Sequence, residues 1–286
     1  MSPPPILVFG VTGSQGGATA RLLLDRGLPV RGLTRKPDGP AAGRLRARGV
    51  EVVGGDMDDD SSLRAALQGC RGVFSVQNWW ERKNDEVAQG RRIADLAQAA
   101  GVEHLVYTSV ARAHDHPDLA HFETKWQVEQ HLHGLDLSWT ILRPVYFMDN
   151  LLNPQAASFH WRVMSHFVGS DSRLQMIACE DIACFAALAF SDPTAWRGRT
   201  VELAGDEVDN PTAVRAFQAA FGKDPKKAPV PGFVMESFRW LMPEVWKMFN
   251  WYRQPVFTAD IPALRQELPG LLDLPTFFAR AARPGA

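Results

Sequence analysis

The 286-residue sequence contains few cysteines and no long hydrophobic run. Its three cysteines, Cys70, Cys179 and Cys184, form no Cys-x-x-Cys pair, which argues against a disulfide framework or a zinc site. No stretch approaches the roughly 20 apolar residues of a membrane span. The amino terminus also lacks the basic segment and apolar run of a signal peptide. We therefore expect a cytoplasmic protein without a membrane partner.

An excess of charge of one sign is also absent. The chain has 31 basic and 32 acidic residues, and no basic block stands out. Direct nucleic-acid binding is therefore not expected. The histidine pairs His114-x-His116 and His131-x-His133 have no neighbouring carboxylate or cysteine cluster that would complete a metal site, so no metal is predicted.

Short apolar runs alternate with helical patterns over the first half of the chain. The predicted strands cover residues 6–9, 30–34, 50–53, 72–76, 104–108 and 138–142. The predicted helices between them cover residues 17–27, 43–48, 61–67, 86–100 and 119–133. The helix at 61–67 would have Ser61 or Ser62 as its N-cap. This alternation predicts an α/β fold of the Rossmann type, with a doubly wound parallel sheet.

The alternation ends near residue 150. Beyond it the patterns predict helices at 181–190 and 212–221, a strand at 200–203, and an aromatic-rich segment at 233–257. We expect a dinucleotide-binding Rossmann domain at 1–150, with the return of later segments to it left open. A smaller, mostly helical portion at 151–286 would bind a substrate or partner. The aromatic segment is more typical of a core or a homodimer surface than of a substrate pocket. Asp181 is expected to cap the helix at 181–190.

A glycine-rich loop follows the first predicted strand and opens the first helix. It contains Gly10, Thr12, Gly13, Ser14, Gln15 and Gly16. Glycines allow a tight turn and let backbone N–H groups approach a pyrophosphate. Because the loop lies between a strand and a helix, it predicts dinucleotide binding rather than a simple turn.

The end of the second strand distinguishes between the two nicotinamide dinucleotides. An NAD site usually has an acidic residue here, which binds the ribose 2′-hydroxyl. The sequence instead reads Leu33-Thr34-Arg35-Lys36, with no acidic residue before Asp38. Arg35 offers a guanidinium fork for a 2′-phosphate and Lys36 adds a positive charge. The sequence therefore favours NADP(H) over NAD(H).

Six segments resemble the NmrA-like family, atypical members of the short-chain dehydrogenase/reductase superfamily. They are residues 8–17 (VFGVTGSQGG), 30–35 (VRGLTR), 55–59 (GDMDD), 78–81 (NWWE), 121–125 (HFETK) and 143–147 (RPVYF). The first is typical of the whole superfamily, whereas the NWWE and HFETK segments are more specific. Similarity continues more weakly into the last third of the chain.

The resemblance implies a role for each matching position. The loop from Gly10 to Gln15 would hold the pyrophosphate and Arg35 the 2′-phosphate. Lys125 would bond the hydroxyls of the nicotinamide ribose. The remaining implied cofactor contacts are Asp56 and Met57 along the adenine, Gln77, Asn78 and Trp79 beside the ribose, and Tyr146, Phe147 and Asn150 near the nicotinamide.

The HFETK segment leaves the chemistry open. The best-known short-chain reductases use Tyr-x-x-x-Lys, in which the tyrosine donates a proton and the lysine binds the ribose. Here His121 stands at the tyrosine position and Lys125 at the lysine position. One interpretation is a redox sensor or regulator that binds NADP(H) and a protein partner, as regulators of this family do. The other is an NADPH-dependent reductase of a small apolar carbonyl, quinone or enone, with Lys125 or His121 as the acid.

Overall fold

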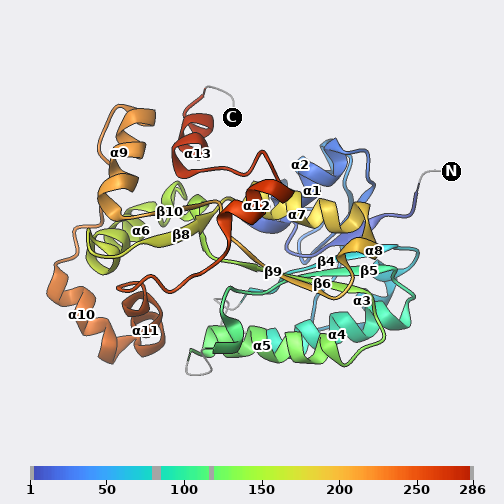
Figure 1. The fold of residues 1–286 in the computed structure, drawn as a ribbon. Helices are drawn as coiled ribbons and strands as arrows, with labels where there is room; N and C mark the ends of the chain where they lie inside the picture. Colours follow the sequence, from blue (N-terminus) through green and yellow to red (C-terminus); the bar gives the residue numbers. More distant parts are fainter. Residues whose placement is uncertain (1–2, 79–84, 116–118, 284–286) are drawn as a thin grey trace. The chain divides into compact units, whose positions relative to one another are not determined.

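The chain folds into two compact units, and each is described by itself. The computed structural model describes residues 3–78, 85–115 and 119–283 (Figure 1). The first unit comprises the described residues up to 115 together with 121–143 and 182–201. The second comprises residues 119–120, 144–181 and 202–283.

A seven-stranded sheet of order β3-β2-β1-β4-β5-β6-β9 forms the centre of the first unit. Its strands are β1 (Ile6–Val8), β2 (Val30–Thr34), β3 (Glu51–Gly54), β4 (Gly72–Ser75), β5 (His104–Thr108), β6 (Trp139–Pro144) and β9 (Arg199–Leu203). From β3 through β6 all neighbouring strands pair in parallel. The predicted α/β fold with a parallel sheet is thereby confirmed. The strand order reverses between β1 and β4, and ligands of such sheets bind beyond the carboxyl ends at this point.

Helices cover both faces of this sheet, and its central strands β1, β4 and β5 are buried along their whole length. The helices are α1 (Ser14–Asp25), α2 (Pro40–Ala47), α3 (Asp60–Leu67), α4 (Glu86–Ala99), α5 (Ala120–His133), α7 (Cys179–Ser191), α8 (Pro193–Trp196) and the short 3-10 helix η1 (Ala113–Asp115). Leu63 of α3, Ile93 of α4 and Val128 of α5 pack in one buried cluster with Leu7 and Leu105 of the sheet. Figure 1 shows α1, α2 and α7 on the opposite side of the sheet.

The second unit contains a small sheet that the sequence analysis did not predict. Its strands are β7 (Tyr146–Phe147), β8 (Leu174–Ile177) and β10 (Asp206–Val208), in the order β10-β8-β7. Its helices are η2 (Met148–Leu151), α6 (Ala157–Val163), η3 (Met164–Val168), α9 (Asn210–Phe221), α10 (Gly232–Leu241), α11 (Pro243–Trp251), α12 (Ile261–Glu267) and α13 (Leu274–Ala281). Strands of two to four residues are too short to show a period of two, which is why the pattern missed them.

Two predicted helix starts need correction. Asp59, not Ser61 or Ser62, is the N-cap of α3, because its carboxylate accepts the backbone N–H groups of both serines at 3.0 and 3.2 Å. Asp181 lies inside the first turn of α7, which begins at Cys179, and its carboxylate accepts the N–H of Leu272 at 3.2 Å. Among the helices described, none is both long and apolar enough to span a membrane.

Candidate functional site

The loop between β1 and α1 has a shape that only glycine allows at its two closest points. Gly10 has a φ of +59°, in the left-handed region, and its carbonyl accepts the N–H of Gly13 at 2.8 Å. A Cβ atom on Gly16 would lie 2.3 Å from the Gly10 oxygen, a clash with backbone that no side-chain motion relieves. The chain therefore turns back on itself here and leaves Thr12 and Ser14 exposed.

The first turn of α1 presents its N–H groups beside this loop. Gly13 is the N-cap, so no side chain caps the helix, and the first turn carries no acidic residue. The first four N–H groups of a helix have no partner within it, and the helix dipole adds partial positive charge. The predicted loop residues Ser14, Gln15 and Gly16 all lie in this turn. The arrangement suits an anion such as a pyrophosphate.

The carboxyl end of β2 adds positive charge to the same unit. Arg35 and Lys36 directly follow the strand and are both exposed. The N–H of Lys36 is held by the hydroxyl of Thr34 at 3.2 Å, which shapes the turn. The structure thus leaves these two cations accessible to a ligand phosphate in solution.

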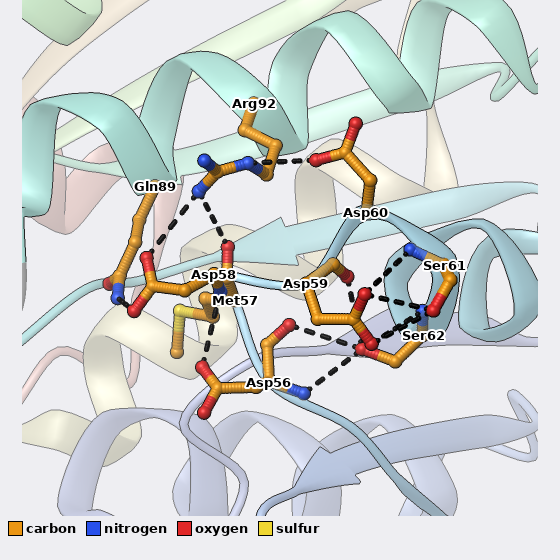
Figure 2. Close-up of polar contacts among 9 residues, drawn as sticks. All are labelled: Asp56, Met57, Asp58, Asp59, Asp60, Ser61, Ser62, Gln89 and Arg92. Atoms are coloured by element: carbon orange, nitrogen blue, oxygen red, sulfur yellow. Dashed lines mark hydrogen bonds and ion pairs between the residues drawn. The ribbon is translucent and has the colours of Figure 1, made fainter.

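The loop between β3 and α3, residues 55–59, is held in place by α4 (Figure 2). Arg92 donates to the carbonyl of Met57 at 3.0 Å and forms an ion pair with Asp60 at 2.9 Å. One turn earlier, the buried Gln89 donates to the carboxylate of Asp58 at 2.9 Å. Within the loop, Asp56 accepts the N–H of Asp58 at 3.1 Å. The predicted adenine contacts, Asp56 and Met57, therefore lie on a fixed backbone.

The carboxyl end of β4 brings a buried amide to the edge of the sheet. Gln77 is 5% exposed and donates to the Ser75 hydroxyl at 2.8 Å. Its side-chain oxygen is buried and has no hydrogen-bond partner among the residues described, so a ligand donor would satisfy it. Asn78 is exposed, and Trp79 lies outside the described residues.

Lys125 is buried and joined to a carboxylate that the sequence analysis did not single out. Its Nζ lies 2.8 Å from Glu86 Oε1 and donates to the carbonyl of Thr108 at 3.2 Å. The other oxygen of Glu86 accepts the hydroxyl of Thr124 at 2.5 Å. Glu86 is the first residue of α4, so nothing in its sequence context distinguishes it from an ordinary first-turn acid.

His121 lies one helical turn before Lys125 on α5. Burial, followed by the positive charge of Lys125, lowers the pKa of His121 to about 4. Only about one ring in a thousand is then protonated at pH 7. This argues against His121 as a general acid near neutrality, because an effective acid has a pKa close to the working pH.

The three predicted nicotinamide neighbours belong to the second unit. The Tyr146 hydroxyl lies 2.7 Å from Nδ1 of His160, and burial raises the pKa of Tyr146 well above its usual value. Phe147 and Asn150 are partly buried, in β7 and η2. Their role beside the nicotinamide stays a prediction.

The sheet order and glycine loop define a Rossmann-type protein, and the sequence places it more narrowly. The model of the NmrA-like family matches residues 4–255, so the chain belongs to this family. It is 36% identical over 204 residues to a (4-alkanoyl-5-oxo-2,5-dihydrofuran-3-yl)methyl phosphate reductase of Streptomyces griseus, covering 71% of this chain and 68% of the relative. It is also 32% identical over 191 residues to the NAD(P)H azoreductase of Xenophilus azovorans, covering 66% and 64% of the two chains.

Solved structures of low sequence identity share the fold. NmrA, a negative transcriptional regulator crystallised with NADP, superposes with a TM-score of 0.75 at 19% identity, covering 98% of this chain and 95% of NmrA. The triphenylmethane reductase of Citrobacter sp., complexed with NADP(H), also gives 0.75 at 19% identity, covering 98% of this chain and all of the reductase. One fold therefore serves both a regulator and an enzyme.

Proposed function

We propose that the protein is an NADPH-dependent reductase of a small organic molecule. The observation that carries the cofactor assignment is the turn from Gly10 to Gly16, which only glycine can form and which opens beside the uncapped start of α1. Arg35 and Lys36 favour the 2′-phosphorylated dinucleotide, because a guanidinium binds phosphate through two parallel hydrogen bonds.

The relatives favour an enzyme over a sensor. The two described above that are more than 30% identical are both named as reductases. The regulator NmrA is similar at 19% identity, which supports the shared fold and no closer role. Reductase activity is thus the better-supported of the two interpretations drawn from the sequence.

A dinucleotide sensor is the second candidate, and the position of His121 favours it. A histidine stands where the best-known reductases of the superfamily have their proton-donating tyrosine, and the pKa of this histidine is about 4. This substitution leaves the glycine loop unchanged, but a histidine with this pKa is a poor proton donor near neutrality.

Each part of the first unit would have a distinct task in the reduction. The bound NADPH supplies a hydride. The Gly10–Gly16 loop and α1 hold the pyrophosphate, and Arg35 binds the 2′-phosphate. The ammonium of Lys125 forms an ion pair with Glu86 and donates a hydrogen bond to the Thr108 carbonyl. Because an ammonium has three donors, it would also bind a ribose hydroxyl. In this scheme the proton that the product requires comes from water or another group, with His121 neutral.

Turnover separates the two candidates. The purified protein is mixed with NADPH and a panel of quinones, enones, aldehydes and azo compounds, and loss of the reduced nicotinamide absorbance is followed. We expect oxidation with at least one class, abolished in Lys125→Ala. Clear NADPH binding by titration without turnover on any of them would favour the sensor.

Cofactor choice tests the role of Arg35. We expect Arg35→Ala to weaken NADPH binding by about 10- to 100-fold, the equivalent of one charge-assisted contact of about 1.5–3 kcal/mol, and to leave NADH binding nearly unchanged. Arg48→Ala removes the same charge from an exposed position at the end of α2 and serves as the control. Equal losses for both cofactors in Arg35→Ala would contradict the assignment.

A further inference from the structure

We infer that Glu86 is a positioning residue, which holds Lys125 as a fixed cation for the ligand hydroxyls of the proposed cofactor site. The inference rests on the proposed binding of NADPH. It adds a residue from α4 that neither the glycine loop nor the HFETK segment contains.

Both carboxylate oxygens of Glu86 contact side chains of α5. Glu86 is 3% exposed and Lys125 is 4% exposed, and the two side chains are joined at 2.8 Å. The second carboxylate oxygen is occupied by the hydroxyl of Thr124, the residue directly before Lys125 on α5. One carboxylate therefore contacts two successive side chains of α5, which fixes both its own rotamer and the direction of the lysine.

The backbone of α4 lies against a side chain of α5 one turn beyond this pair. A Cβ atom on Gly90 would lie 2.6 Å from Cγ2 of Val128, so the approach depends on glycine. Gly90 is four residues after Glu86, and Val128 is three after Lys125. Because these spacings put each pair on one helix face, the close contact sets the distance between the carboxylate and the ammonium.

Energetics explains why the carboxylate is needed. An ammonium removed from water pays a desolvation cost of several kcal/mol, and an opposite charge with good geometry offsets it. The Thr108 carbonyl alone supplies only a dipole. Without Glu86, no opposite charge would offset this cost.

Other titratable groups face Lys125, and none can replace Glu86. The Tyr107 ring lies 5.3 Å from Nζ, and burial together with the charges of Glu86 and Glu129 raises its pKa well above the usual value, so it stays neutral. Glu129, also on α5, is bound by Arg143 at 2.6 Å. His121 is neutral near pH 7. From β5, the Thr108 carbonyl accepts a hydrogen bond from Lys125 Nζ and carries no charge.

The test measures NADPH affinity in Glu86→Gln, both alone and in a Lys125→Met background. Glutamine keeps the size and an acceptor oxygen but removes the charge. We expect the dissociation constant of Glu86→Gln at pH 7 to rise about tenfold or more. A purely structural role would weaken binding by the same factor whether or not residue 125 is a lysine.

Three further variants sharpen the result. Asp95→Asn removes a carboxylate from an exposed position of the same helix and should bind NADPH like the wild type. Glu86→Asp keeps the charge and should bind NADPH more tightly than Glu86→Gln, although less tightly than the wild type. In a Lys125→Met background, adding Glu86→Gln should not weaken binding further.

The outcomes separate the two proposals. If the wild type fails to bind NADPH, the proposed function falls. If the wild type binds and Glu86→Gln matches it in affinity, the positioning role is overturned while the function stands. If Glu86→Gln does not fold, Glu86→Asp decides. A loss of NADPH affinity that disappears in the Lys125→Met background supports the role, and no loss, or an equal loss in both backgrounds, overturns it.

Discussion

Among the residues described, α4 and α5 share two contacts between a carboxylate and a basic side chain, and these differ in almost everything except length. Glu86 and Lys125 lie 2.8 Å apart with side chains 2% and 5% exposed. Asp95 and His131 lie 2.6 Å apart with side chains 52% and 28% exposed. The shorter contact is thus the one in water. The distance between the two groups alone therefore says little about what either pair contributes to stability.

The solvent exposure of each pair decides how much the pair contributes to the stability of the fold. In water, two unit charges at about 4 Å attract by only about 1 kcal/mol, and salt weakens this further. A buried pair has a larger attraction and a larger desolvation cost, so breaking it leaves a charge with neither water nor a partner. Breaking the pair at Glu86 should therefore destabilise the protein more than breaking the pair at Asp95.

The largest effect is expected from breaking the buried pair. We expect Lys125→Met to lower the free energy of unfolding by about 3–5 kcal/mol, because it leaves the Glu86 carboxylate buried without its cation. The double variant Lys125→Met with Glu86→Gln should regain much of that loss, since neither charge then remains. Urea denaturation measures all three. Losses that simply add would show that the two charges do not depend on each other.

The next effect concerns pH at the buried end. The pKa of His121 is about 4 when folded and about 6.5 when unfolded. Between these values the unfolded chain binds the additional proton, so its contribution to stability is complete above pH 6.5 and is lost as the pH falls towards 4. Because the side chain is partly exposed, we expect a loss of about 2 kcal/mol or less.

His121→Asn should flatten this slope between pH 6.5 and 4. The ring titration itself is followed by NMR, with an expected midpoint near 4. A midpoint near 6.5 would contradict the described environment and would restore His121 as a candidate acid. Stability measured at pH 7 and above should be insensitive to the titration.

The smallest effect is expected at the exposed pair. Asp95→Asn should change the free energy of unfolding by less than about 1 kcal/mol, and added salt should shrink the difference. Thermal denaturation at low and high ionic strength measures it. A loss as large as that of Lys125→Met would break the comparison, because it would mean that exposure does not control the strength of these pairs.

The sequence alone predicted the parts of the fold that depend on local patterns. The strands at 30–34 and 104–108 were predicted residue for residue, because strand-like segments alternate with helical patterns in this half of the chain. The glycine loop was equally visible, since its spacing reflects contacts within a few residues. The start of α1 was placed at residue 17 rather than Ser14, because the glycines that open the helix carry no helical pattern.

Local sequence patterns predicted only part of the candidate site. Lys125 could be singled out from its segment, but its partner Glu86 is 39 positions earlier, with no motif around it. Arg92 likewise holds the loop at Met57 from 35 residues away. Such pairs have no spacing rule, because their distance along the chain reflects the sheet order rather than local geometry.

The sequence by itself determined the Rossmann-type sheet and the glycine turn at Gly10–Gly16, and it is the basis of the proposed 2′-phosphate contact at Arg35. These follow from backbone conformation and from residues near one another in the chain. Only the tertiary structure decided that Lys125 is a buried cation and that His121 is neutral. Both depend on desolvation and on a carboxylate from another helix, and burial is a property of the folded chain that no short segment encodes.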